Sequence, residues 1–310
     1  MAVGESAEIL DAGTEVKPAT DRSVSPVELL WDLVFVFAIT QVGTLLSNQL
    51  TWDGFGRSML VLALVWWAWS AFVWVANAED AESPVFLLTL LAALVLIFIS
   101  GLAIPHAFGE RATLFAVTYA GVRFMHLGLY AHSARQGHAS WEAIAGFSLT
   151  VTAGMILLVA GSLLALPWQI ALWASAAVID YAGPLLTRGR LRGLQQVAVA
   201  HFADRYGAFI IICLGESIIA IGLGATREPI TTALVALVAL GLLATIGLWW
   251  TYFGRTAAAA AARLREHVEP VLGATTLLGP SAIASHAHSS AITAASHATT
   301  THARQPPAIP

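Results

Sequence analysis

The chain has 310 residues, of which 57% are hydrophobic and only 11% are charged, and its mean hydropathy is +0.74. Soluble domains carry about 25% charged residues, so this composition predicts a membrane protein. The net charge of −4 argues against nucleic-acid binding. The single cysteine excludes an internal disulfide or a cysteine metal cluster, and we expect no metal site.

Both ends of the chain are polar. Residues 1–26 are acidic and lack the basic start and short apolar core of a cleavable signal peptide. We therefore expect a cytoplasmic tail followed by an uncleaved anchor. Residues 255–310 are rich in Ala, His, Ser, Thr and Pro, and no part of them is apolar enough to span a bilayer. Such biased composition predicts a disordered tail.

Between these ends lie segments long enough to cross a bilayer, which takes about 20 mostly apolar residues. Eight segments qualify: 27–46, 58–76, 84–104, 112–131, 144–164, 168–187, 206–224 and 231–253. The weakest is 168–187, which contains Asp180 and Pro184. The sequence thus predicts an all-α fold, a polytopic transmembrane helix bundle over residues 27–254 embedded in the lipid bilayer.

The loop charges predict the orientation of this bundle. Of the 15 Lys and Arg residues, 11 fall on the N-terminal side of the predicted membrane, 3 fall on the opposite side, and Arg123 lies within a span. Basic loops stay in the cytoplasm. We therefore expect a multi-pass protein of the bacterial cytoplasmic (inner) membrane with both termini in the cytoplasm. Trp66, Trp67, Trp69 and Trp74 are expected to anchor helices at the membrane interface.

Two acidic residues open the first span. A charged group inside a span costs about 2.5–3.5 kcal/mol on insertion scales, so it marks a function or a specific partner. Glu28 is expected at the cytoplasmic interface, where it stabilises a helix N-terminus. Asp32 lies about one turn deeper. A structural ion pair is the alternative to a functional role for both.

The fourth span carries a polar stripe. Tyr119, Arg123, His126 and Tyr130 follow at intervals of four, three and four residues, so they share one helix face. An arginine avoids lipid, and the stripe should therefore face the bundle interior or a water-filled cavity. Two interpretations stay open: a binding site, or an interhelical hydrogen-bond network that fixes packing.

The sixth span combines a carboxylate with a proline. Asp180 precedes Pro184 by four residues, and proline frees a helical carbonyl. Broken helices beside carboxylates hold coupling cations in many transporters. The alternative is a simple proline kink with Asp180 near the interface.

The seventh span places a carboxylate deep in the membrane. Glu216 follows Arg205 by 11 residues, about 16 Å along a helix, which is too far for the two to pair. Glu216 therefore needs a partner from another helix, a bound cation or a proton. Asp204 and Arg205 are expected near the membrane edge. The acids outnumber Arg123 in the interior, which favours protons or small cations as ligands.

Five segments resemble the bacterial low-temperature-requirement A family in the right order. They are 25–41 (SPVELLWDLVFVFAITQ), 123–130 (RFMHLGLY), 180–184 (DYAGP), 201–207 (HFADRYG) and 214–218 (LGESI). The resemblance covers roughly residues 24–269 and implies a multi-span inner-membrane protein without an established substrate. Members tend to carry Asp where this chain has Gly254, and they continue with further spans. Our hypothesis is that the polar tail is truncated or out of frame.

The sequence predicts a secondary transporter or channel-like permease that moves a small solute, of unknown identity, with proton or cation coupling. Glu216 and Asp32 would bind the coupling ion, Asp180 would assist, and Arg123 would be their alternating counter-charge. The motifs of hydrolases, phosphate-binding loops and dinucleotide-binding folds are missing, so we expect no enzyme and no cofactor. The rival is a non-transporting scaffold or stress-related protein whose polar residues lock helices together. The sequence indicates no oligomeric state.

Overall fold

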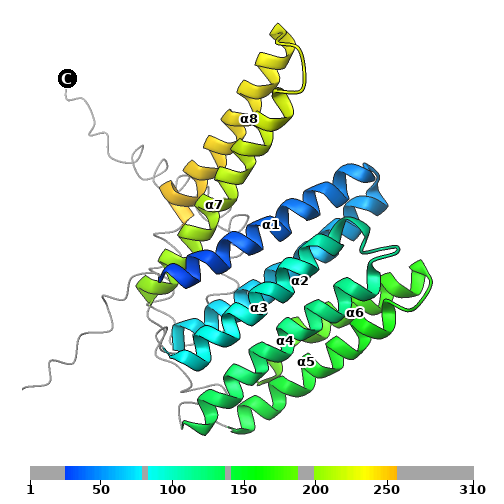
Figure 1. The fold of residues 1–310 in the computed structure, drawn as a ribbon, viewed down its shortest axis with the longest axis vertical. Helices are drawn as coiled ribbons and strands as arrows, with labels where there is room; N and C mark the ends of the chain where they lie inside the picture. The colour runs from blue at the N-terminus through cyan, green and yellow to red at the C-terminus, as the bar shows by residue number, and fades with distance from the viewer. Residues whose placement is uncertain (1–24, 79–82, 137–140, 188–198, 257–310) are drawn as a thin grey trace, which may run out of the picture.

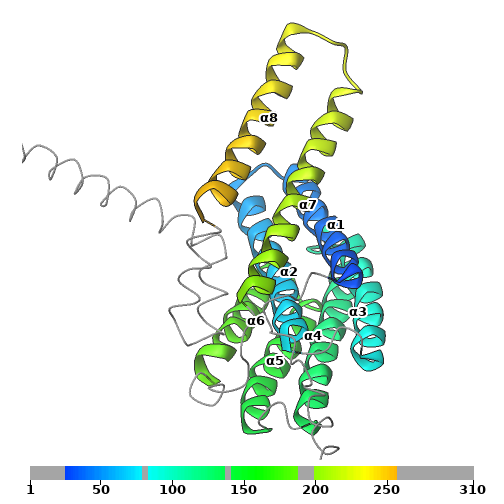
Figure 2. The same ribbon diagram turned by 90° about the vertical axis from the view of Figure 1, so that its left-hand side faces the viewer.

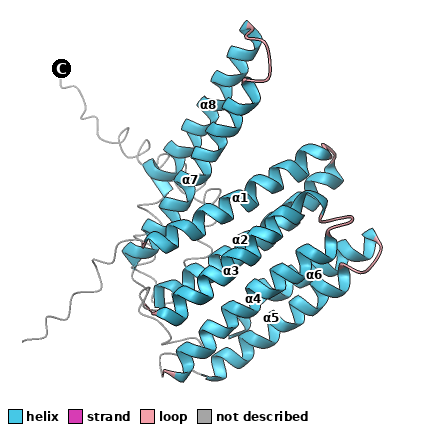
Figure 3. Ribbon diagram, in the orientation of Figure 1, coloured by secondary structure: helices cyan, strands magenta, loops and turns pink. Residues whose placement is uncertain are grey.

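A computed structural model describes residues 25–78, 83–136, 141–187 and 199–256. The predicted tails, 1–26 and 255–310, lie almost wholly outside these residues. Within the described part the fold is entirely helical, with short connections (Figure 3). The helices are α1 (Pro26–Asn48), α2 (Trp52–Ala78), α3 (Pro84–Ala103), α4 (Ala112–Arg135), α5 (Trp141–Gly161), α6 (Leu166–Thr187), α7 (Val199–Ala225) and α8 (Thr232–Thr251), with short turns η1 (Ile104–His106) and η2 (Tyr252–Thr256).

The eight predicted segments each fall within one of these helices or overlap it closely, which confirms the predicted helical bundle. Six of the described helices are long and apolar enough to span a membrane: α1, α2, α3, α5, α7 and α8. The remaining two, α4 and α6, are also long enough at about 1.5 Å per residue. Helix α4 carries Arg123 among several other polar residues, and α6 carries Gln169 and Asp180.

The start of α1 shows how local sequence sets a helix boundary. Ser25 is the N-cap, and its hydroxyl accepts a hydrogen bond from the Glu28 amide at 3.4 Å. The Glu28 carboxylate in turn accepts a hydrogen bond from the Ser25 amide at 2.8 Å, which completes a capping box. Pro26, the first helical residue, needs no hydrogen-bond partner for its nitrogen. This part of the predicted role of Glu28, at a helix N-terminus, is confirmed.

Helices α1 to α6 form a layered body, and α7 and α8 form a hairpin that diverges from α1 (Figures 1 and 2). Helix α2 lies inside this body, with 72% of its most apolar window buried. For α7 and α8 the corresponding share is 6% each. The hairpin therefore joins the body mainly through the first part of α7, which packs on α1 and α2.

The sixth helix corrects one prediction. Pro184 does not break α6, which continues to Thr187. The proline lies in the last turn, where only the carbonyl of Asp180 loses its helical partner. A helix end tolerates this loss because its last carbonyls lack helical partners in any case.

Candidate functional site

The first buried ion pair joins α1 to α7. Asp32 Oδ1 accepts a hydrogen bond from Arg205 Nη2 at 2.9 Å and another from Trp69 Nε1, on α2, also at 2.9 Å. Asp32 and Arg205 are 0% and 1% exposed. The sequence placed Arg205 near the membrane edge without naming a partner for it, and the structure buries it against Asp32. Three helices therefore meet at one carboxylate oxygen.

This pair uses only part of its hydrogen-bonding capacity. A carboxylate has about four acceptor positions and a guanidinium five donors. Within the described residues, Asp32 Oδ2 and the Nε and Nη1 atoms of Arg205 have no hydrogen-bond partner. Buried polar groups are normally satisfied, so such a cluster suits a site that changes partners or protonation state.

Aromatic rings pack the start of α7 against α2. Trp69 stacks on Phe209 with ring centroids 4.1 Å apart and meets Tyr206 edge-on at 4.7 Å. The hydroxyl groups of Tyr206 and Ser70 lie 3.0 Å apart, within hydrogen-bond distance. The contact between hairpin and body is thus aromatic and polar at the level of Asp32, and it excludes solvent from the ion pair.

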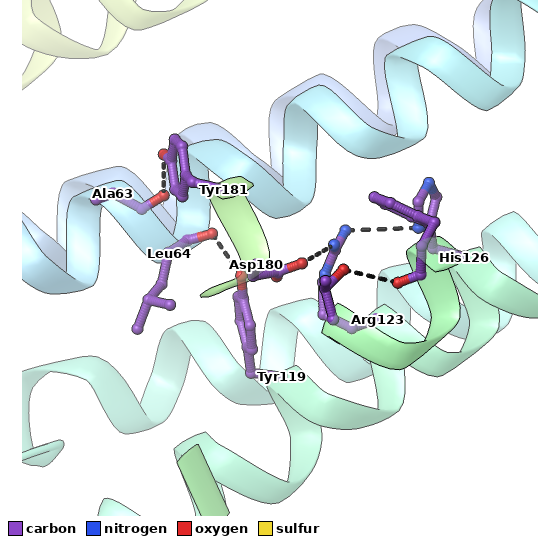
Figure 4. A network of polar contacts seen from close by, with 9 residues as sticks. Ala63, Leu64, Tyr119, Arg123, His126, Asp180 and Tyr181 are labelled. Carbon is purple, nitrogen blue, oxygen red and sulfur yellow. Dashed lines mark hydrogen bonds and ion pairs between the residues drawn. The ribbon is translucent and has the colours of Figure 1, made fainter. Parts of the chain in front are cut away.

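The second buried ion pair joins α4 to α6 (Figure 4). Arg123 Nη2 donates to Asp180 Oδ1 at 2.6 Å, and both side chains are 0% exposed. Arg123 Nη1 lies 3.5 Å from His126 Nδ1. The stripe predicted on α4 does face the interior, since Tyr119, Arg123 and His126 are buried.

Two tyrosines tie this second pair to α2. The Tyr119 hydroxyl donates to the Leu64 carbonyl at 2.7 Å, and the Tyr181 hydroxyl donates to the Ala63 carbonyl at 2.8 Å (Figure 4). Trp67 stacks on Tyr181 with centroids 4.2 Å apart. Both helices that carry the pair are therefore bonded to neighbouring carbonyls of one central helix.

The other candidate residues lie apart from these two pairs. Tyr130 meets His126 edge-on at 4.8 Å. Asp204 is exposed next to Arg205. Glu216 is partly exposed on α7, and the described residues offer it no hydrogen bond or ion pair. Cys213 lies three residues before Glu216 on α7 and is half-buried.

The structure refines three expectations. Arg123 was predicted as the alternating counter-charge to Glu216, Asp32 and Asp180, and of these three acids it pairs with Asp180. Among the described residues the predicted excess of buried acids shrinks to Glu28, because Asp32 and Asp180 each face an arginine and Glu216 is only partly buried. The tryptophans on α2 were expected at the membrane interface, yet three of them are core residues: Trp67, Trp69 and Trp74.

Sequence reasoning also missed Trp69 and Tyr181 as polar partners. Both are aromatic residues that look apolar in a hydropathy pattern, although each carries one hydrogen-bond donor. Nothing in the hydropathy pattern marks Trp69 or Tyr181 as a hydrogen-bond donor to another helix. Within the described residues, no group of three His, Cys, Asp or Glu side chains could hold a metal ion.

Long apolar helices and buried ion pairs together define a multi-pass α-helical membrane protein with a polar interior. The family model described as Bacterial low temperature requirement A protein matches residues 23–307, and the chain belongs to this family. The chain is also similar to an uncharacterized protein of Rhizobium meliloti (strain 1021), with 29% identity over 245 residues. That alignment covers 76% of this chain and 60% of the relative, so the chain matches about three fifths of the relative's length. No solved structure matches the chain.

Proposed function

We propose that this protein is a proton-coupled transporter of a small solute in which Asp32 accepts the coupling proton and Arg205 is its counter-charge. The observation that carries the proposal is the position of this pair. The pair lies where the weakly buried α7–α8 hairpin joins the six-helix body. Within the described residues, buried polar atoms of both Asp32 and Arg205 have no hydrogen-bond partner.

A proton suits Asp32 better than a metal cation. Arg205 already places a positive charge 2.9 Å from Oδ1, which would repel a second cation there. Sodium or potassium sites also need several oxygen ligands, and among the described residues Asp32 is bonded only to nitrogen donors. A proton on Oδ2 would need no such cage.

Protonation would weaken the joint between hairpin and body. Neutral Asp32 loses the charge-assisted hydrogen bond to Arg205, and Arg205 is left as a buried charge without its partner. Arg205 must then find another hydrogen-bond acceptor, and because Arg205 is part of α7, this helix would move with it. Movement of one helix group against another around a central site is a common form of alternating access.

The second ion pair, Arg123–Asp180, suits a structural role because its surroundings are tightly packed. A Cβ added at Gly154 would lie 3.2 Å from the Ala176 carbonyl, and one added at Gly183 would lie 2.6 Å from Thr150 Oγ1. Helices α5 and α6 therefore approach each other closely around Asp180. We propose that Arg123 and Asp180 lock the body, while Asp32 and Arg205 control the hairpin.

Glu216 fits the proposal as a second proton acceptor on the hairpin. It lies about 16 Å along α7 from Arg205 on nearly the same face. Glu216 would take up its proton independently of Asp32, because its side chain lies outside the ion pair and is only partly covered by the described residues.

The single cysteine allows a test without a known substrate. Cys213 is half-buried on α7 near Asp32, so its rate of labelling by a maleimide, corrected for the thiol pKa measured in each variant, reports the position of α7. We expect Asp32→Asn to label faster than the wild type. The matched control is Asp53→Asn, which removes a carboxylate from a partly exposed pair at the far end of α2 and should leave the rate unchanged.

Transport itself is tested in vesicles that contain the purified protein and an internal pH dye. Sugars, amino acids and organic cations are added in turn, and we expect one class to move protons in the wild type and not in Asp32→Asn. Solute-driven proton movement that survives in Asp32→Asn would refute the assignment of Asp32.

The rival function is a non-transporting scaffold, and one observation favours it: each fully buried arginine has an acidic partner. A scaffold predicts that Asp32→Asn lowers stability without changing Cys213 labelling in the protein that remains folded. No solute-driven proton movement together with unchanged labelling would favour this function over transport.

A further inference from the structure

An open groove of about 590 Å³ runs between α3 and α4, away from both ion pairs. Helix α3 contributes Val85, Leu88, Thr89 and Ala92, and helix α4 contributes residues from Met125 to Arg135. Because the two helices are antiparallel neighbours, the groove lies where α3 begins and α4 ends (Figure 1).

The walls of the groove are apolar over most of its length. Leu88 is 67% exposed and Val85 is 44% exposed, so both offer apolar surface to a ligand. The Thr89 hydroxyl donates to the Val85 carbonyl at 2.7 Å, which leaves its methyl group to the groove. No heavy atom lies within 4 Å of a Cβ added at Gly128, so this position leaves space between the helices.

The end of the groove is basic. His132 and Arg135 line it at the last turns of α4, and no acidic residue is among its described lining. The His132 ring nitrogen Nε2 lies 3.0 Å from the Gln136 side-chain amide. Arg135 is exposed and forms no ion pair or hydrogen bond within the described residues.

The dimensions fit one membrane leaflet. From Met125 to Arg135 the helix rises about 15 Å, which is half of the roughly 30 Å hydrocarbon core. The groove is apolar along this length and ends in two basic side chains. A phospholipid has the same arrangement, with apolar acyl chains followed by a negatively charged phosphate. Basic pockets between transmembrane helices bind anionic head groups in this way.

We propose that this groove binds an anionic phospholipid, with its acyl chains between α3 and α4 and its phosphate on Arg135 and His132. The site is independent of the proposed transport. Three acidic residues, Glu79, Asp80 and Glu82, precede α3 in the sequence and lie outside the described residues. A head group that also carries an amine is therefore the competitor that the test must include.

The test is native mass spectrometry of the delipidated full-length protein with added phosphatidylglycerol, phosphatidylethanolamine or inorganic phosphate. We expect phosphatidylglycerol to bind most tightly and Arg135→Gln to weaken it about fivefold, the effect of one basic residue near a membrane surface. Gly128→Trp should fill the groove and abolish binding while leaving the charge in place.

Matched controls separate this site from general effects. Arg255→Gln removes a basic residue near the same predicted membrane face but on η2, and Gly247→Trp adds a large side chain on α8, where no heavy atom lies within 4 Å. Both should bind phosphatidylglycerol like the wild type. Thermal unfolding without lipid confirms that each variant is folded.

Three results would overturn the proposal. Equal binding of phosphatidylethanolamine and phosphatidylglycerol would show that the groove does not select an anionic head group. Tight binding of inorganic phosphate that competes with the lipid would identify a free-phosphate site instead. Undiminished lipid binding in folded Gly128→Trp would place the lipid elsewhere.

Discussion

The Arg123–Asp180 pair makes a strong prediction about stability. Both side chains are 0% exposed and their nearest atoms are 2.6 Å apart, so removing one partner leaves a buried charge without compensation. Such a loss costs about 3–5 kcal/mol. We expect Asp180→Asn and Arg123→Met each to lower the free energy of unfolding by this amount.

The double variant should be less damaging than the sum of the two changes, because it leaves neither charge behind. We expect a coupling energy of about 2–3 kcal/mol, near the top of the usual range for contacting residues. The assay is reversible unfolding in mixed micelles with increasing SDS, followed by tryptophan fluorescence. The four proteins of the cycle are compared under one condition.

A partly exposed pair in the same chain is the matched control. Arg57 and Asp53 form an ion pair one turn apart on α2, and their side chains are 14% and 64% exposed. Asp53→Asn should therefore cost less than about 1 kcal/mol. Single substitutions at the buried pair that cost no more than this control would refute the reasoning, as would a double variant that equals the sum of its singles.

Three further predictions use the same unfolding assay. Gly183→Ala should cost about 1–3 kcal/mol, because its Cβ would lie 2.6 Å from Thr150 Oγ1, whereas Gly128→Ala has open space and should be neutral within about 0.5 kcal/mol. Trp69→Phe should cost about 1.5–3 kcal/mol through the lost hydrogen bond to the Asp32 carboxylate, and a loss no larger than that of Trp66→Phe would contradict the contact. Ser25→Ala should cost about 0.5–2 kcal/mol by removing the cap of α1, and an unchanged midpoint would show that the capping box contributes nothing.

The helices themselves were predictable from the sequence because hydropathy is a local property. Each span is a run of about 20 residues whose apolar character does not depend on its neighbours. Helices α4 and α6 were also found, since apolar residues separate the polar ones along both. The burial of the α4 stripe followed from the same argument, because an arginine in a span avoids lipid.

The partners of the buried charges were not predictable in this way. Arg123 and Asp180 are 57 residues apart, and Asp32 and Arg205 are 173 apart. A hydropathy pattern places each group at a depth but says nothing about which helices are neighbours. Arg123 was therefore assigned to three acids at once, and the pairing of Arg205 with Asp32 was not foreseen.

The tryptophans of α2 show a related limit. Aromatic residues near a span end are typical of interfacial anchors. Helix α2 packs against α1, α4, α6 and α7, however, so Trp67 and Trp69 are buried among protein side chains. Whether a span lies at the centre or the edge of a bundle is decided by its neighbours, which its own sequence does not contain.

The two tyrosine bonds to α2 restrict the motions that this fold can make. Carbonyl groups of successive residues are placed about 100° apart around the helix axis, as 3.6 residues per turn requires. Tyr119 and Tyr181 hold the adjacent carbonyls of Leu64 and Ala63 from two different helices. Helix α2 therefore cannot turn about its own axis without losing both bonds, so α4 and α6 together fix its rotation within the bundle.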